Sequence, residues 1–199
     1  MNDYFSLLGV PRILRLDSRD LERRYRALSR EVHPDFFHNA PLAEKRASLE
    51  RTSNLNDAYR TLREPVSRIT HLIELESAGA MRTRADDQVP PALLEEVFAL
   101  NEELDEVRAL RATGVPDDEW IEKLEKARRP IEARRVAHEA DLEELSARWD
   151  AAAMRAEAHL ERQQVLATLR DRLLERNYIA NLIADIERTL GEGHASSHA

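Results

Sequence analysis

The sequence LERRYRALSREVHPD, residues 21–35, combines two helical stripes with a helix break. One stripe is apolar and the other is cationic, and both recur at spacings of 4, 3 and 4 residues, as in an amphipathic helix. The apolar stripe consists of Leu21, Tyr25, Leu28 and Val32, and the cationic stripe of Arg19, Arg23, Arg26 and Arg30. Because successive residues turn by about 100°, the stripes lie on opposite sides of one helix, and we expect the arginines to face outward.

The tripeptide His33-Pro34-Asp35 ends this helix. Proline disfavours helical geometry at the residue before it, so the break falls at His33. Pro41 suits the first turn of a second helix, because its missing N–H would be unbonded there. The sequence therefore predicts two helices joined by a loop, with the row of arginines running toward His33.

Each of these features has an ordinary explanation when taken alone. An arginine-rich face is most often only a solvated face, and a His-Pro-Asp tripeptide occurs by chance. The combination is more specific, because a cationic face, a helix break and His-Pro-Asp follow one another within about 25 residues.

This combination resembles the J domain of DnaJ-type co-chaperones, in particular the HscB family of iron–sulfur cluster assembly. The resemblance is strong over about the first 75 residues. It is carried by residues 3–11 (DYFSLLGVP), 21–28 (LERRYRAL), 33–37 (HPDFF) and 56–62 (NDAYRTL), followed by Pro65 and Arg68. Phe36 departs from the family pattern, which has a lysine at that position.

Composition restricts both fold and function. Of the 199 residues, 42% are hydrophobic and 34% charged, with five glycines, which is typical of long charged helices. A net charge of -8 argues against a general nucleic-acid binder. The absence of cysteine excludes disulfides and cysteine-ligated metals or clusters, and no cofactor is expected. We find no signal peptide, no room for a transit peptide and no membrane-spanning apolar run, so we expect a cytoplasmic protein with no membrane partner.

We expect an all-α fold, and the resemblance implies an N-terminal J domain, an antiparallel helical hairpin with flanking helices, plus a C-terminal three-helix bundle in an L shape. The expected segments are a J domain over 1–76, a linker over 77–91, the bundle over 92–190 and a disordered tail over 191–199. The predicted helices span residues 4–8, 18–32, 41–63, a stretch from Pro65, 91–112, 117–149 and 151–190. Pro130 should kink or split the helix over 117–149.

The first helix of the expected bundle carries two separate lines of residues at helical spacing. Leu93, Val97, Leu100, Leu104 and Val107 form a bundle seam. A second line, Leu94, Phe98, Glu102 and Glu106, begins about 100° away from the seam. Large apolar groups bordered by acids favour a protein-binding surface, although another helix or the N-terminal domain could also cover them.

The resemblance assigns this second line to binding of an IscU-like iron–sulfur scaffold protein, since residues 100–106 (LNEELDE) match the family's acidic helix. Glu95 and Ala99 depart from the family pattern and are left out of the expected contacts. Tyr178 is a further expected scaffold contact from a weaker match over residues 176–182, and it could equally be a core residue.

The resemblance implies a monomeric co-chaperone that performs no chemistry of its own. The partners would be an HscA/DnaK-like ATPase chaperone and the scaffold. The expected chaperone-binding residues are His33, Pro34, Asp35, Arg19, Arg23, Arg26 and Arg30. Three alternatives remain: a J-domain co-chaperone with a different client, a metal-dependent hydrolase using His33, Asp35 and His38, and a structural coiled coil.

Overall fold

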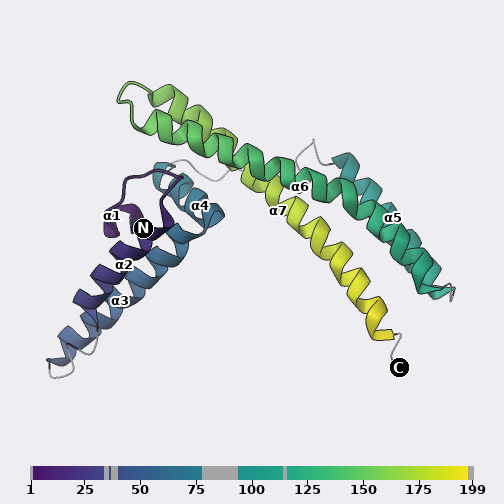
Figure 1. Cartoon of the computed structure of the whole chain (residues 1–199), viewed down its shortest axis with the longest axis horizontal. Helices are drawn as coiled ribbons and strands as arrows, with labels where there is room; N and C mark the ends of the chain where they lie inside the picture. Colours follow the sequence, from purple (N-terminus) through teal and green to yellow (C-terminus); the bar gives the residue numbers. More distant parts are fainter. Residues whose placement is uncertain (1, 34–35, 37–39, 78–93, 114–115, 197–199) are drawn as a thin grey trace. The chain divides into compact units, whose positions relative to one another are not determined.

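The computed structural model describes the chain except residues 1, 34–35, 37–39, 78–93, 114–115 and 197–199. Over the described residues it consists of seven α-helices without any strand, so the all-α prediction is confirmed (Figure 1). The helices are α1 (Tyr4–Leu7), α2 (Ser18–Val32), α3 (Leu42–Arg63), α4 (Pro65–Glu76), α5 (Leu94–Ala112), α6 (Asp117–Ala153) and α7 (His159–Ser196). Among the described helices, none has the length and apolar character that crossing a bilayer requires.

The chain forms two compact units. The N-terminal unit comprises Met1–Ala80 together with Glu144–Arg170, and the C-terminal unit comprises Met81–Glu143 together with Asp171–Ala199. Helices α6 and α7 are therefore shared between the units. The sequence predicts a single division of the chain, at the linker over residues 77–91. The assignment of a separate function to each side of that linker remains a prediction.

Short polar caps and a buried apolar face build the first four helices. The Asp17 carboxylate accepts from the backbone N–H groups of Arg19 and Asp20, which starts α2 at the expected residue. Pro65 occupies the first turn of α4. The core of this part contains Phe5, Leu8, Leu14, Leu21, Leu55, Ala58, Leu62, Ile69 and Leu72. Tyr25 of α2 stacks on Tyr59 of α3 with a centroid separation of 4.2 Å, which ties the two long helices together.

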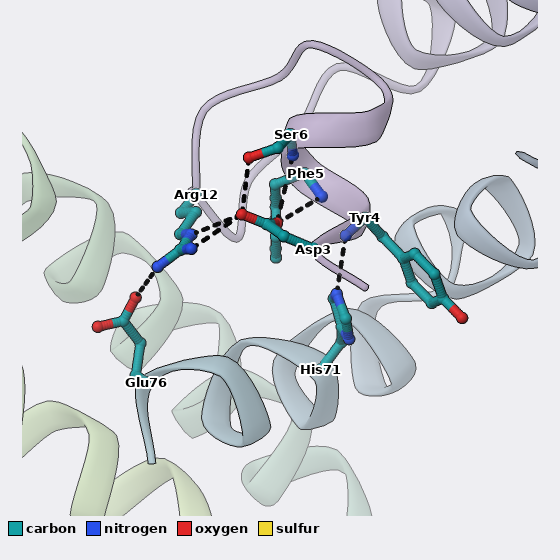
Figure 2. A network of polar contacts seen from close by, with 7 residues as sticks. All are labelled: Asp3, Tyr4, Phe5, Ser6, Arg12, His71 and Glu76. Atoms are coloured by element: carbon teal, nitrogen blue, oxygen red, sulfur yellow. Dashed lines mark hydrogen bonds and ion pairs between the residues drawn. The ribbon is translucent and has the colours of Figure 1, made fainter. Parts of the chain in front are cut away.

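A polar network fixes the start of α1 (Figure 2). The Asp3 carboxylate accepts from the backbone N–H groups of Phe5 and Ser6 at 3.0 and 3.2 Å. The guanidinium of Arg12 lies between the carboxylates of Asp3 and Glu76, at 2.8 Å from each. The short α1 therefore depends on Asp3 for its cap and on Arg12 for its link to the end of α4.

The segment between α1 and α2 is held by the end of α6. The indole Nε1 of Trp149 donates to the carbonyl of Arg12 at 3.0 Å. The carboxylate of Asp150 accepts from the backbone N–H of Leu14 at 2.6 Å and from that of Arg15 at 3.0 Å. On the other side, the buried guanidinium of Arg68 donates to the carbonyl of Leu14. These bonds explain why residues 144–170 belong to the N-terminal unit.

The core of the C-terminal unit lies between α5, α6 and α7. Its buried side chains are Leu100, Leu104, Val107, Trp120, Leu124, Ile131, Ile179, Leu182 and Ile186. Val97 packs against this cluster, so the predicted seam of α5 faces the core from Val97 onward, whereas Leu93 lies outside the described residues.

The course of α6 through Pro130 and the ends of α6 and α7 differ from the predictions. Helix α6 continues through Pro130, so the proline does not split it. An interior proline costs about 3 kcal/mol, and burial of other α6 side chains, such as Leu124 and Ile131, offsets that cost. Helix α6 also runs to Ala153, because alanines follow Trp149 without a helix breaker, and α7 begins at His159 rather than at Ala151. The tail expected to be disordered is helical as far as Ser196.

Candidate functional site

The row of arginines on α2 faces solvent. Arg19, Arg23, Arg26 and Arg30 are all exposed, whereas Leu21 on the opposite side is buried. The other apolar-stripe residues, Tyr25, Leu28 and Val32, are partly buried. The outward orientation that helical periodicity predicts for the four arginines is therefore confirmed. Their role in binding stays a prediction.

Two acids on the same helix moderate this positive charge, which the sequence reasoning missed. Asp20 forms ion pairs with Arg23 and with Arg24, the latter at 2.8 Å. Glu22 pairs with Arg26 at 2.5 Å. The spacings of three and four residues along one helix could have indicated these pairs. Because such exposed pairs are weak, a partner's acidic groups can compete for the arginines.

The row of arginines ends at His33, the residue that caps the C-terminus of α2. Its backbone has left the helical region, with φ -59° and ψ 131°, as the following proline requires. The imidazole is exposed, and the ring of Phe36 meets it edge-on with a centroid separation of 6.4 Å. The backbone N–H of Phe36 donates to the carbonyl of His33 at 3.1 Å. Pro34 and Asp35 lie outside the described residues.

The hydrolase alternative gains no geometric support from the described part of the chain. Two of its three residues, Asp35 and His38, lie outside it. Within the described residues, no group of three or more histidines and carboxylates is arranged to hold a metal ion.

The line predicted for scaffold binding lies on the solvent side of α5. The side chains of Leu94 and Phe98 are 38% and 66% exposed, and Glu102 and Glu106 are exposed as well. Within the described residues of the C-terminal unit, no helix covers Phe98. The two lines that helical geometry placed on different sides of α5 thus differ in burial: the seam is buried from Leu100 onward and the line from Leu94 to Glu106, called the outer line below, is exposed. The binding role of the outer line stays a prediction.

Two details refine this surface. Glu106 forms an ion pair with Lys123 of α6, and Lys123 also lies 3.4 Å from Glu103. Tyr178 is partly buried and packs against the core of the C-terminal unit. This packing favours the core role that the sequence left open for Tyr178, while its predicted scaffold contact remains untested.

The N-terminal part matches the DnaJ domain over residues 3–71. Together with the hairpin of α2 and α3 and the His33 break between them, this match defines a J-domain protein.

The similar proteins narrow the class further. Relatives named "Co-chaperone protein HscB homolog" include that of Azoarcus sp. (strain BH72), 39% identical over 54% of this chain and 60% of the relative. The relative from Bordetella petrii is 36% identical over 54% and 62% of the two chains, and that from Bordetella avium 36% identical over 66% and 76%. The match thus spans about three fifths of the length of the first two relatives.

Solved structures agree with these relatives. The human co-chaperone protein HscB is similar with a TM-score of 0.64 and 26% identity, over 94% of this chain and 81% of that structure. HscB from Vibrio cholerae gives a TM-score of 0.62 and 26% identity, over 96% and 99% of the two chains. The chain belongs to the HscB co-chaperone family.

Proposed function

We propose that this protein stimulates the ATPase of an HscA/DnaK-like chaperone and brings an IscU-like iron–sulfur scaffold protein to it. The observation that carries the proposal is the exposed row of arginines on α2 that leads directly to the exposed imidazole of His33. Membership of the HscB family supports the assignment.

In this proposal the two parts of the α2 surface have separate tasks. The arginines attract an acidic surface of the chaperone, which mainly raises the rate and fixes the orientation of encounter. His33, together with Pro34 and Asp35, then makes the specific contacts that promote ATP hydrolysis by the chaperone. This chain supplies contacts only, and the chemistry belongs to its partner.

The outer line of α5 supplies the second contact. The exposed ring of Phe98 and the side chain of Leu94 provide an apolar anchor, and Glu102 and Glu106 provide a polar rim. A chain that holds the chaperone with one surface and the scaffold with another raises the effective concentration of scaffold at the chaperone. This linkage accounts for two exposed surfaces of opposite charge on one chain.

Steady-state ATP hydrolysis by the purified chaperone tests the proposal. We expect stimulation by this protein, and a further synergistic rise when the scaffold is added. The variant His33→Gln should abolish stimulation while leaving the helical content unchanged, because the imidazole is exposed.

The outcomes separate the alternatives. If His33→Gln stimulates as well as the wild-type protein, the assignment of the chaperone-binding site is wrong. If the wild-type protein stimulates but ignores the scaffold, the J-domain role stands and a different client must occupy α5. A folded wild-type protein without any stimulation contradicts the whole proposal.

A further inference from the structure

A buried hydroxyl occurs in the exposed first half of α3. Between residues 42 and 51, Ser48 is the only buried side chain, with 1% of its surface exposed. A buried hydroxyl without a partner would be costly. Ser48 avoids this cost by donating from its Oγ to the carbonyl of Val32 at 2.8 Å. One turn further along α3, Thr52 donates from its Oγ1 to the same carbonyl at 3.2 Å.

The carbonyl that receives these two bonds is the last of α2. Carbonyls at the C-terminus of a helix lack an intrahelical partner. A carbonyl oxygen has two lone pairs, so both hydroxyls can bind at once. We call Ser48 and Thr52 together the hydroxyl clamp. The clamp replaces the hydrogen bonds that α2 would form if it continued beyond Val32.

The clamp acts on the peptide group that leads into His33. The carbonyl of Val32 and the backbone nitrogen of His33 belong to one planar peptide unit, so fixing the oxygen fixes the plane from which His33 departs. The proline after His33 independently restricts its ψ, which is 131° here. Two constraints therefore meet at His33, one from α3 and one from the chain itself.

We propose that Ser48 and Thr52 are positioning residues, which hold His33 in the orientation that the chaperone recognises. This role rests on the proposed function, because it concerns how His33 acts once the arginines of α2 have docked. Without the clamp, the protein still docks, but His33 is in place in a smaller fraction of the docked complexes.

Other contacts also hold α2 against α3, so packing of the two helices does not depend on the hydroxyl clamp. The rings of Tyr25 and Tyr59 stack, and the Tyr25 hydroxyl bonds with the side-chain oxygen of Asn56 at 2.8 Å. Asn56 lies one turn beyond Thr52 on α3. A hydrogen bond between the same two helices, but away from His33, therefore offers a matched control.

The test compares ATPase stimulation by the full chain carrying Ser48→Ala, Thr52→Val or both. Thr52→Val keeps the side-chain shape and removes the donor. Each lost hydrogen bond lowers the equilibrium constant for positioning His33 by about two- to tenfold, and the two losses together lower it by about fourfold or more. The double variant should therefore lower maximal stimulation by about threefold. The concentration for half-maximal stimulation should stay within about twofold, because the arginines are untouched. The variant Thr52→Ser keeps the hydroxyl donor, so its maximal stimulation should equal that of the wild type, in contrast to Thr52→Val.

The control Asn56→Ala should lose a hydrogen bond between α2 and α3 without lowering maximal stimulation. Amide hydrogen exchange at His33 and Phe36 gives a second readout, which needs no chaperone, and it should accelerate in the clamp variants but not in Asn56→Ala.

Each other result overturns a defined part of the reasoning. A double variant with wild-type maximal stimulation overturns the positioning role, whatever its exchange rate at His33, and leaves the proposed function intact. An equal loss of stimulation in Asn56→Ala shows that hairpin stability alone matters, which also overturns it. A wild-type protein that does not stimulate the chaperone overturns the proposed function and the clamp's role with it.

Discussion

At the scale of single residues, His71 connects α4 to the start of α1. Its Nε2 accepts the backbone N–H of Tyr4 at 3.1 Å, and its ring stacks on that of Tyr4 at 4.4 Å (Figure 2). Only an imidazole that carries no proton on Nε2 can accept this bond. Burial lowers the pKa of His71 below its ordinary value of 6.5, although Glu74 and Asp3 nearby oppose that shift. Folding therefore favours the neutral ring.

The sign of the resulting pH dependence follows from this shift. The unfolded chain takes up a proton at His71 near pH 6.5, whereas the folded chain does so only at lower pH. The stabilisation is fully present above about pH 6.5 and is lost as the pH falls through the folded-state pKa. We predict that the free energy of unfolding, measured by urea titration, decreases between about pH 7 and about pH 5.

The variant His71→Gln should reduce this decrease, because glutamine does not titrate. A second buried histidine, His138 of the C-terminal unit, also has a pKa lowered by burial, with Glu175 opposing the shift. His138→Gln should therefore remove a separate part of the pH dependence. An unchanged decrease in His71→Gln would show that the bond to Tyr4 does not control it.

At the scale of elements, α5 presents one face to the core and another to solvent. Truncating the solvent face in the double variant Leu94→Ala and Phe98→Ala should weaken scaffold binding by about 30-fold or more, as expected for anchor residues. The free energy of unfolding should change by less than about 1 kcal/mol, since both side chains keep contact with water. Calorimetric titration with the scaffold and urea unfolding measure the two quantities.

The matched control lies on the other face of the same helix. Leu104 is 3% exposed, so Leu104→Ala should cost about 2–5 kcal/mol of stability. If the double variant at Leu94 and Phe98 proves as destabilising as this control, the outer line of α5 is core and not a binding surface.

The faces of α2 and α5 could be predicted from the sequence because helical periodicity records which side is buried. The end of α2 was predicted from a local signal, Pro34. Asp17, whose carboxylate caps the start of α2, is a local signal as well. The course of α6 was not predicted. Proline is a local signal as well, but burial of other α6 residues, such as Leu124 and Ile131, in the core outweighs it. The packing partners that bury them cannot be read from the local sequence.

At the scale of the whole molecule, the N-terminal unit is built from two separate parts of the chain, Met1–Ala80 and Glu144–Arg170. The sequence gives no sign of this arrangement. Asp150 binds backbone N–H groups of Leu14 and Arg15, and every residue type except proline carries such a group. The hydroxyl clamp was missed for the same reason: its acceptor is the backbone carbonyl of Val32, a group that every residue carries.

This architecture predicts that a change in α6 loosens a segment more than 130 residues earlier. Asp150→Ala leaves two backbone N–H groups without their carboxylate, and bonds to a charged acceptor contribute about 1.5–3 kcal/mol. We therefore predict faster amide hydrogen exchange at Leu14 and Arg15, and a lower free energy of unfolding of the N-terminal unit. Glu144→Ala removes an exposed carboxylate from the same helix and should leave both unchanged.

The same contact predicts the behaviour of a fragment. Residues 1–77 alone would lack Trp149 and Asp150, so the carbonyl of Arg12 and the N–H groups of Leu14 and Arg15 would turn to water. Exchange at Leu14 and Arg15 in the fragment should be at least as fast as in Asp150→Ala of the full chain, because the fragment also lacks the Trp149 bond. If the fragment protects these amides as well as the full chain does, the N-terminal hairpin orders the segment by itself, and α6 contributes nothing to it.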